Sequence, residues 1–286
     1  MYIAKECVAC GSKRLIKSPS VLMPFVADRA LDWGPVEMTT DWGLQSIEIG
    51  TLHCRTNSVA CKSCHTVFLD LRFGDDEIKS LYKDYRGADY NAKRTMYEPE
   101  YSRKSSVFSY RYPYLANAEI WIQRHITPET VLDWGGDDGL NSLFRGTKSK
   151  IYLHDISGVV PKYGTQMYSK KDADICFDLV TCNQVLEHVP EPLKILEEIR
   201  AIMSPHTWLY FDLPFEKIMQ GDTPLDKRLE RKKHWHEHIN FFSAEGIKQL
   251  VKQAGLNFVE LRSISATNRT GEDLIFQVLC NNQSYD

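Results

Sequence analysis

The sequence has no long hydrophobic run and no strong excess of charge of one sign. No apolar stretch approaches the roughly 20 residues of a membrane span, and residues 1–10 lack the apolar core of a signal peptide. We therefore expect a cytoplasmic protein without a membrane partner. The net charge of −3 over 286 residues offers no general attraction for nucleic acid. The 43% hydrophobic and 26% charged content is typical of a soluble globular chain.

Internal repeats and low-complexity tracts are also missing, and the chain divides into two unlike parts. Residues 1–100 have poor periodicity and hold all the paired cysteines, whereas the remainder alternates between strand-like and helix-like segments. Such alternation predicts a parallel sheet with helices on both faces. We expect an N-terminal region over 1–100 and an α/β domain over 101–286. The expected strands are 130–134, 150–156, 177–183, 208–214, 257–264 and 273–280, and the expected helices are 114–126, 191–203 and 243–255.

Eight cysteines in a cytoplasmic chain indicate metal binding or buried thiols rather than disulfides. Four of them form two C-x-x-C pairs, and each pair can grip a metal from one tight turn. The pairs are separated by residues 11–60, a longer gap than in a compact zinc ribbon, and reduced cysteines in a small core are the alternative. We predict a closed, structural zinc site with Cys54, His53 and His65 as spare donors and Cys7, Cys10, Cys61 and Cys64 as ligands.

The segment VLDWGGDDG, residues 131–139, predicts a strand followed by a ligand-binding turn. Its glycines would let the backbone approach a ligand, and an expected helix after it would offer free N–H groups. The dinucleotide pattern G-x-G-x-x-G fails, because Asp137 and Leu140 occupy its second and third glycine positions. An ordinary strand-to-helix turn is the alternative interpretation.

The same segment resembles motif I of class I S-adenosylmethionine (SAM) methyltransferases, D-x-G-x-G-x-G, with Asp137 in place of the middle glycine. FDLVTCNQVLEHVPEP and FFSAEGIKQLVKQAGLNFVEL resemble later elements of that family in the right order, so the likeness covers about residues 115–286. It implies a Rossmann-like, doubly wound sheet of seven strands with the last strand antiparallel. This fold class would carry the small N-terminal zinc-binding domain as an attachment.

The resemblance also implies a set of cofactor contacts for SAM. Asp133 would hold the methionine amino end, and the carboxylate of Asp155 would accept bonds from both ribose hydroxyls. The other implied contacts are the turn glycines Gly135, Gly136 and Gly139. Asn183 and Gln184, at the end of the family's fourth strand, would lie beside the methionine moiety, and Asp172 and Ala173 would lie near the adenine.

The cysteine pairs together with LYKDYRGADY, residues 81–90, resemble the N-terminal region of sugar C-methyltransferases that act on nucleotide-linked ketosugars. The known members carry a further C-terminal domain of well over a hundred residues, whereas this sequence ends at Asp286. We therefore expect an acceptor pocket built from the N-terminal half and residues 216–240.

The stretch KKHWHEHINFFS, residues 232–243, has histidines at every second position. Spacing alone allows a zinc site, a proton-handling site or a surface strand. The stretch resembles the sugar-methyltransferase motif Y-H-E-H-x-x-Y-F-S, which implies His238 as a base oriented by Glu237, with His188 of LEHV beside them. Implied acceptor contacts are Tyr85, Tyr90, Trp235 and His236; the preceding cations Lys227, Arg228, Arg231 and Lys232 would bind a diphosphate or form a solvated face.

The sequence thus predicts SAM-dependent methylation, at carbon or oxygen, of a sugar or nucleotide-linked sugar in polysaccharide or glycosylated-metabolite biosynthesis. One alternative is a zinc-knuckle ribosomal-RNA methyltransferase, which the net charge of −3 disfavours. Another is a non-catalytic scaffold with the same fold. The sequence does not determine the oligomeric state.

Overall fold

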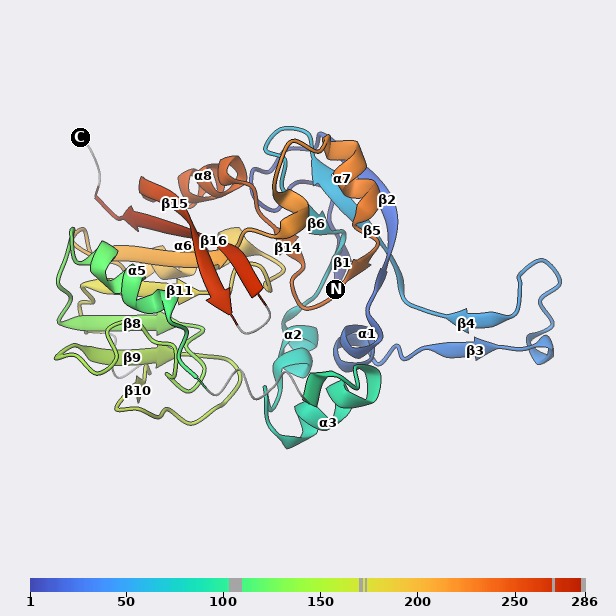
Figure 1. The fold of residues 1–286 in the computed structure, drawn as a ribbon, viewed down its shortest axis with the longest axis horizontal. Helices are drawn as coiled ribbons and strands as arrows, with labels where there is room; N and C mark the ends of the chain where they lie inside the picture. The colour runs from blue at the N-terminus through green and yellow to red at the C-terminus, as the bar shows by residue number, and fades with distance from the viewer. Residues whose placement is uncertain (103–109, 170–171, 173, 269–270, 284–286) are drawn as a thin grey trace.

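The computed structural model describes residues 1–102, 110–169, 172, 174–268 and 271–283 (Figure 1). Ala173, one of the two predicted adenine contacts, lies outside the described residues. No helix in the described part of the chain is long and apolar enough to cross a membrane.

The larger sheet contains seven strands and confirms the predicted fold class. All its strands are parallel except β16, which runs antiparallel to both neighbours. The shortest strand, β10, was not expected from the sequence, because its two residues are exposed and lack an apolar pattern. In spatial order the strands are β10 (Gln166–Met167), β9 (Lys150–His154), β8 (Thr130–Trp134), β11 (Leu179–Asn183), β12 (Trp208–Pro214), β16 (Gly271–Asn281) and β15 (Asn257–Asn268).

Helices cover both faces of this sheet, as predicted. Helix α5 (Tyr114–Ile122) packs on one face, where Leu115 joins a core cluster with Val131 and Leu179. Helices α6 (Pro192–Ala201) and α8 (Ala244–Gln253) pack on the other face, in a cluster that contains the next residues of the same strands, Leu132 and Val180. Successive strand residues face opposite sides of a sheet, so the continuous apolar runs fill two cores.

The helix expected after β8 is absent, and that prediction is wrong. Residues 135–149, all described by the structure, form turns without an α-helix. Gly135, Asp137 and Gly139 have φ angles of 78°, 50° and 90°, whereas a right-handed helix requires negative φ. The turn therefore offers its own backbone groups, and no helix N-terminus, to a ligand.

The N-terminal region forms a second sheet of five strands, and two of them come from the later part of the chain. Strands β13 (His234–Trp235) and β14 (Asn240–Phe241) flank the strands of the first hundred residues. Those inner strands are β2 (Leu15–Leu22), β5 (Arg55–Cys61) and β6 (Val67–Leu69). The histidine stretch therefore ties the two parts together, and the division at residue 100 stays a prediction.

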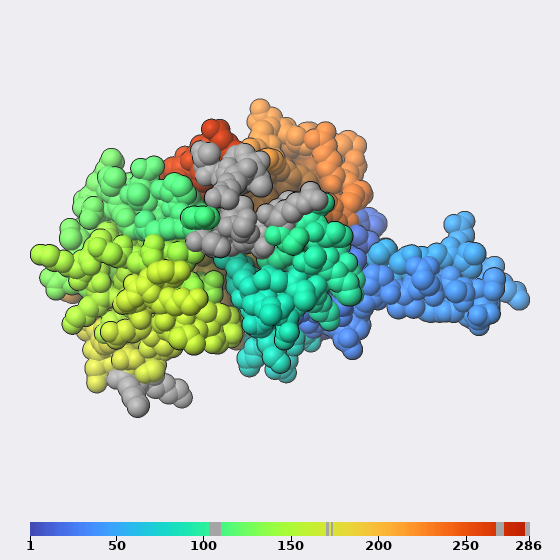
Figure 2. All heavy atoms as spheres, turned by 60° about the horizontal axis from the view of Figure 1, so that its bottom comes forward, coloured from blue at the N-terminus to red at the C-terminus, as the bar shows by residue number. Residues whose placement is uncertain are grey.

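Smaller elements surround this second sheet. The hairpin of β3 (Val36–Met38) and β4 (Gly50–Leu52) projects far from the rest of the molecule (Figures 1 and 2), and no residue of 32–53 is buried. The others are β1 (Tyr2–Ile3), β7 (Leu71–Arg72), α1 (Pro24–Leu31), α2 (Asp75–Tyr82), α3 (Ala88–Tyr97), α7 (Leu225–Arg231) and the 3-10 turns Thr40–Trp42 and Lys217–Met219.

Candidate active site and cysteine cluster

A cavity of about 1430 Å³ is lined by residues of both parts of the chain. The glycine turn and the end of β11 contribute Asp133, Gly135, Gly136, Asn183 and Gln184. The N-terminal part contributes Tyr85, Arg86 and Arg94, and the segment around the histidine stretch contributes Glu216, Arg231, Lys232, His234, Glu237 and His238; His188 also lines it.

The glycine turn approaches its neighbours so closely that side chains are excluded. A Cβ on Gly135 would lie 2.5 Å from Val185 Cγ2, and one on Gly136 would lie 2.9 Å from Asp133 Oδ2. Asp137, the departure from the family pattern, adopts the left-handed conformation that aspartate tolerates. Its carboxylate lies 3.8 Å from Arg86 Nη1, so the N-terminal part contacts the turn. Gly139 also has positive φ but faces Thr165 and not the cavity.

Asp133 is buried at the end of β8 and braced from two sides. Its Oδ2 accepts a hydrogen bond from Ser142 Oγ at 2.6 Å and its Oδ1 accepts one from Thr181 Oγ1 at 2.9 Å. Burial raises the pKa of Asp133 to about 6, although both hydrogen bonds act in the opposite direction. The carboxyl is thus held in one orientation at the cavity wall.

Asn183, at the end of β11, has a buried amide whose Nδ2 and Oδ1 both lack a hydrogen-bond partner among the described residues. Leaving one such polar group unpaired costs about 1–3 kcal/mol, so a ligand in the cavity would satisfy it. The neighbouring Gln184 is instead held by Asp212, to which its Nε2 donates at 2.9 Å. The unpaired amide beside a glycine turn fits the polar amino-acid end of SAM, which both accepts and donates hydrogen bonds.

The residues expected at the nucleoside end are placed differently. Asp155 accepts from the backbone N–H of Asp137 at 2.9 Å and of Ser157 at 2.7 Å, so its carboxylate holds the glycine turn. Asp172 accepts from the N–H and hydroxyl of Ser169. Neither Asp155 nor Asp172 is among the described residues that line the cavity. The structure therefore brings together the residues predicted for the methionine end and not those predicted for the ribose and adenine.

Glu237 is buried and locked by three neighbours on one side of the histidine stretch. Tyr90 donates its hydroxyl to Oε1, Arg94 donates to Oε2 at 2.7 Å, and His236 Nδ1 lies 3.4 Å from Oε2. Burial alone would raise the pKa of Glu237, but the hydrogen bond from His236 and the charge of Arg94 outweigh it and hold the pKa well below its usual range. Glu237 is therefore a structural anion, and its carboxylate forms no hydrogen bond or ion pair with the imidazole of His238.

His238 is held by a different carboxylate, Glu216. Its Nδ1 donates to Glu216 Oε1 at 2.8 Å, and its ring centroid lies 4.6 Å from that of His188. Burial would lower the pKa of His238, but the bond to Glu216 and the charges of Glu187 and Glu216 raise it above the ordinary value. Burial, followed by the charge of His238, lowers the pKa of His188 to about 3. The pKa values of the two imidazoles are therefore shifted in opposite directions.

Two predicted acceptor contacts from the histidine stretch do not line the cavity. Trp235 is fully buried, donates from Nε1 to Ser58 Oγ at 2.8 Å, and lies under Lys232 Nζ, 4.2 Å from the ring centroid. The prediction for Trp235 is corrected on this ground, because a core residue of the second sheet cannot contact an acceptor. His236 stacks on Phe25 and bonds to Glu98.

Of the remaining predicted contacts, some line the cavity and others do not. Tyr85 lines the cavity, whereas Tyr90 is fully buried behind it. Arg231 and Lys232 line the cavity, but Lys227 pairs with the exposed Glu230 at 3.0 Å, as a solvated face would. The three histidines of the stretch do not form a common metal site among the described residues. Sequence reasoning missed Glu216 and Arg94, because no local motif marks either.

The loop LEHVP, residues 186–190, is fixed by two residues from outside its own strand. Arg72 is fully buried and donates to the carbonyl oxygens of Val189 at 3.1 Å and Pro190 at 2.8 Å, and to Asn240 Oδ1 at 2.7 Å. Asn240 in turn donates from Nδ2 to the carbonyls of Leu186 and Val189. This network sets the position of His188 relative to His238.

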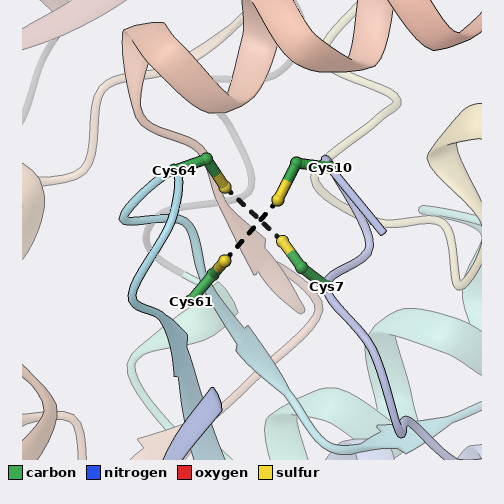
Figure 3. Close-up of side chains that lie close together, drawn as sticks. All are labelled: Cys7, Cys10, Cys61 and Cys64. Carbon is green, nitrogen blue, oxygen red and sulfur yellow. Dashed lines mark hydrogen bonds between the residues drawn. The ribbon is translucent and has the colours of Figure 1, made fainter. Parts of the chain in front are cut away.

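The four paired cysteines converge on one point (Figure 3), with each pair on its own tight turn. Cys7 Sγ lies 3.5 Å from Cys64 Sγ, and Cys10 Sγ lies 3.6 Å from Cys61 Sγ. Four sulfurs about 2.3 Å from a tetrahedral zinc would lie about 3.8 Å apart, so the cluster has the size of a zinc site. Left-handed residues, Gly11 and His65, follow the two pairs and close the turns.

The cysteine cluster packs against the larger sheet's helix α8. Cys7, Cys61 and Cys64 belong to the same core cluster as residues of that helix. Ser243, the N-cap of α8, donates its hydroxyl to the carbonyl of Cys64, and it also accepts from Gly246 N at 2.9 Å. The cluster thus stabilises the junction between the two parts and lies outside the cavity lining.

Comparison with known proteins gives matches to methyltransferases. The family described as "Methyltransferase domain" matches residues 111–261. A curated ubiquinone biosynthesis O-methyltransferase of Burkholderia pseudomallei is 27% identical over 95 residues, which are 31% of this chain and 40% of that protein. The protein of the same name from Paraburkholderia phymatum is 25% identical over 172 residues, 51% of this chain and 72% of its own length. The chain thus spans about 40% of the length of the first curated relatives it matches.

Solved structures are similar at lower identity. A 1,6-didemethyltoxoflavin-N1-methyltransferase of Burkholderia thailandensis, solved with S-adenosylhomocysteine, is 14% identical with a TM-score of 0.48, over 78% of this chain and 97% of that one. A SAM-dependent methyltransferase of Aquifex aeolicus is 18% identical with a TM-score of 0.40, over 62% and 96%.

Proposed function

Because this chain belongs to the family of methyltransferase domains, we propose that it transfers a methyl group from SAM to a small-molecule acceptor bound in the cavity. The observation that carries the proposal is that one cavity is lined by the glycine turn, by the unpaired amide of Asn183 and by the imidazoles of His188 and His238. A methyltransferase needs a cofactor site and a proton-handling site within reach of each other.

The amino-acid end of SAM would be held by Asp133 and Asn183, with the backbone of Gly135 and Gly136 close to it. When bound, SAM supplies an electrophilic methyl group on a sulfonium. The chain's task is then to orient the acceptor in line with that methyl group and to make the acceptor atom nucleophilic.

Removal of the acceptor's proton is assigned to the part of the cavity lined by His188 and His238. Glu216 positions His238 by its bond to Nδ1. Glu237 keeps an indirect role, because it fixes the backbone of the stretch through Arg94 and Tyr90. This replaces the predicted pairing of Glu237 with His238.

For the acceptor we propose a sugar or a nucleotide-linked sugar. Arg231, Lys232 and His234 line the cavity and could bind a diphosphate. The resemblance of the cysteine and histidine motifs to sugar methyltransferases supports the same class. The names of the curated relatives favour oxygen as the methylated atom, so phenolic acceptors belong in the same test.

The cysteine cluster is proposed to bind one structural zinc ion through Cys7, Cys10, Cys61 and Cys64. Its four thiolates leave no open position, and its place at the junction with α8 fits a structural role.

The direct test measures SAM consumption over a panel of nucleotide sugars, free sugars and phenols. Turnover with one acceptor class, and its loss in His238→Ala, would support the proposal. SAM binding without turnover on any of these acceptors would show that the proposed acceptor class is wrong. Failure to bind SAM in calorimetry would favour a scaffold, and salt-dependent binding of RNA would favour an RNA methyltransferase.

A further inference from the structure

Glu187, His188 and His238 place three metal-ligand atoms within 4.8 Å of one another. Glu187 and His188 lie in the loop after β11, and His238 lies between β13 and β14, so the group joins the two sheets. His188 and His238 line the cavity, and Glu187 lies buried behind them. The first two residues belong to a motif whose glutamate has no role in the proposed reaction.

The carboxylate of Glu187 is buried without a hydrogen-bond partner among the described residues. The residue is 0% exposed, and neither oxygen accepts a hydrogen bond from another described residue. Its Oε1 lies 3.8 Å from His188 Nε2, too far for a hydrogen bond. Its backbone carbonyl accepts from Ile239 N at 2.8 Å and Asn240 N at 3.0 Å, so the residue is held in place. A buried carboxylate is expensive unless it is paired, coordinates a metal or takes up a proton.

Both histidines are oriented through their Nδ1 atoms, which leaves Nε2 of each ring as the atom available to a metal ion. His188 Nδ1 lies 3.1 Å from the carbonyl oxygen of Glu237 and 2.9 Å from Tyr82 Oη, and His238 Nδ1 donates to Glu216. An imidazole that donates its other N–H to a carbonyl or carboxylate is the usual arrangement of a metal ligand. In the neutral form of each ring, with the proton on Nδ1, Nε2 offers a lone pair to a metal ion.

We propose that Glu187, His188 and His238 bind a divalent first-row transition-metal ion at the cavity wall. Two imidazoles and one carboxylate suit zinc, iron, cobalt or manganese and leave positions open for an oxygen of the acceptor. Ligand atoms about 2.1 Å from one metal lie roughly 3.0–3.6 Å apart, so the three atoms, which lie within 4.8 Å of one another, would approach by up to about 1–2 Å. The site is distinct from the four-cysteine cluster, which supplies sulfur ligands only.

This inference rests on the proposed function only for the metal's role. A metal-bound hydroxyl or enol oxygen loses its proton more readily, so acceptor activation would pass through the ion. Binding of the ion itself is independent of whether SAM or any acceptor is used.

The test titrates Co²⁺ into the purified full chain with its cysteine cluster loaded with zinc. We expect one Co²⁺ per chain with visible absorption bands of nitrogen and oxygen ligands and without thiolate charge-transfer bands. Glu187→Gln and His238→Ala should each weaken Co²⁺ binding at least tenfold, whereas His206→Ala, at an exposed histidine outside the group, should not change it. Circular dichroism checks that the buried Glu187→Gln variant is folded. His238→Ala changes a half-buried position, so it tests Co²⁺ binding independently if Glu187→Gln does not fold.

Absence of Co²⁺ binding in the wild type would overturn the inference. Binding in Glu187→Gln and His238→Ala that is as tight as in the wild type would also overturn it. A proton shared between Glu187 and His238 would give that outcome. If the chain consumes SAM but binds no Co²⁺, the metal site is wrong and the proposed function stands. If Co²⁺ binds but no acceptor is methylated, the metal site stands and the proposed function is wrong.

Discussion

His238 is oriented by Glu216, 22 positions earlier in the chain, and not by its neighbour Glu237. Nδ1 of His238 donates to Glu216 Oε1 at 2.8 Å, while the Glu237 carboxylate is bound by Tyr90 and Arg94. The two glutamates therefore have separable roles, one in positioning the imidazole and one in holding the fold.

The same chemical change at these two glutamates should give opposite results. Glu216→Gln should lower kcat for SAM consumption about tenfold, a fraction of the full effect of general-base catalysis, with little change in stability. Glu237→Gln breaks a buried charge pair with Arg94 and should cost about 3 kcal/mol of unfolding free energy. Steady-state kinetics and urea denaturation on both variants give the comparison. Loss of kcat in a stable Glu237→Gln together with an unaffected Glu216→Gln would reverse the assignment.

The contribution of Glu237 to stability should disappear in acid. Its pKa in the fold lies below the ordinary value of 4.5, so the unfolded chain takes up the proton first as the pH falls, and the stabilisation is lost on going below that value. The difference in unfolding free energy between wild type and Glu237→Gln should be widest near about pH 5.5, where His236 is also protonated, and should shrink below pH 4.5. A difference that stays constant to about pH 3.5 would show that Glu237 is not ionised in the fold.

Removal of one cysteine ligand should release a thiolate-bound zinc. Cys10→Ser should contain about one zinc per chain less than the wild type and should unfold with a stability loss of about 2 kcal/mol or more. Cys176→Ser is the matched control, because Cys176 is exposed and outside the cluster. Elemental analysis and thermal unfolding report the two quantities. Equal zinc content in both variants would mean that the cluster holds reduced thiols only.

Asn183→Ala should have opposite effects on the free and the SAM-bound protein. Without ligand, removal of an unpaired buried amide should leave stability unchanged or raise it by up to about 1–3 kcal/mol. Affinity for SAM should fall about tenfold, because the partner of its amino-acid end is lost. Asn117→Ala, at an exposed position of α5, should change neither quantity. Thermal unfolding and calorimetry separate the outcomes, and unchanged SAM affinity in Asn183→Ala would exclude it as a cofactor contact.

Local patterns in the sequence were enough to predict most strands and helices of the larger sheet. The alternation of strand-like and helix-like segments predicted a parallel sheet with helices on both faces, the family resemblance implied its seven strands, and Ser243 and Gly255 marked the ends of α8. These signals are short-range, because capping and side-chain periodicity depend on neighbours within one turn or one strand. The same logic failed after β8, where an expected helix is replaced by left-handed residues that carry no clear pattern.

The sequence by itself determined which chemical groups are available: two cysteine pairs, a glycine turn and a stretch rich in histidine. Only the tertiary structure decided how they combine. It buried Trp235, paired His238 with Glu216, and brought Glu187 and His188 to the same point as His238. Those contacts join segments 22 or more positions apart, and their geometry follows from how β13 and β14 flank the second sheet. Glu237 and His238 are adjacent and both line the cavity, but their side chains bind partners that the fold brings from different segments, Arg94 for Glu237 and Glu216 for His238.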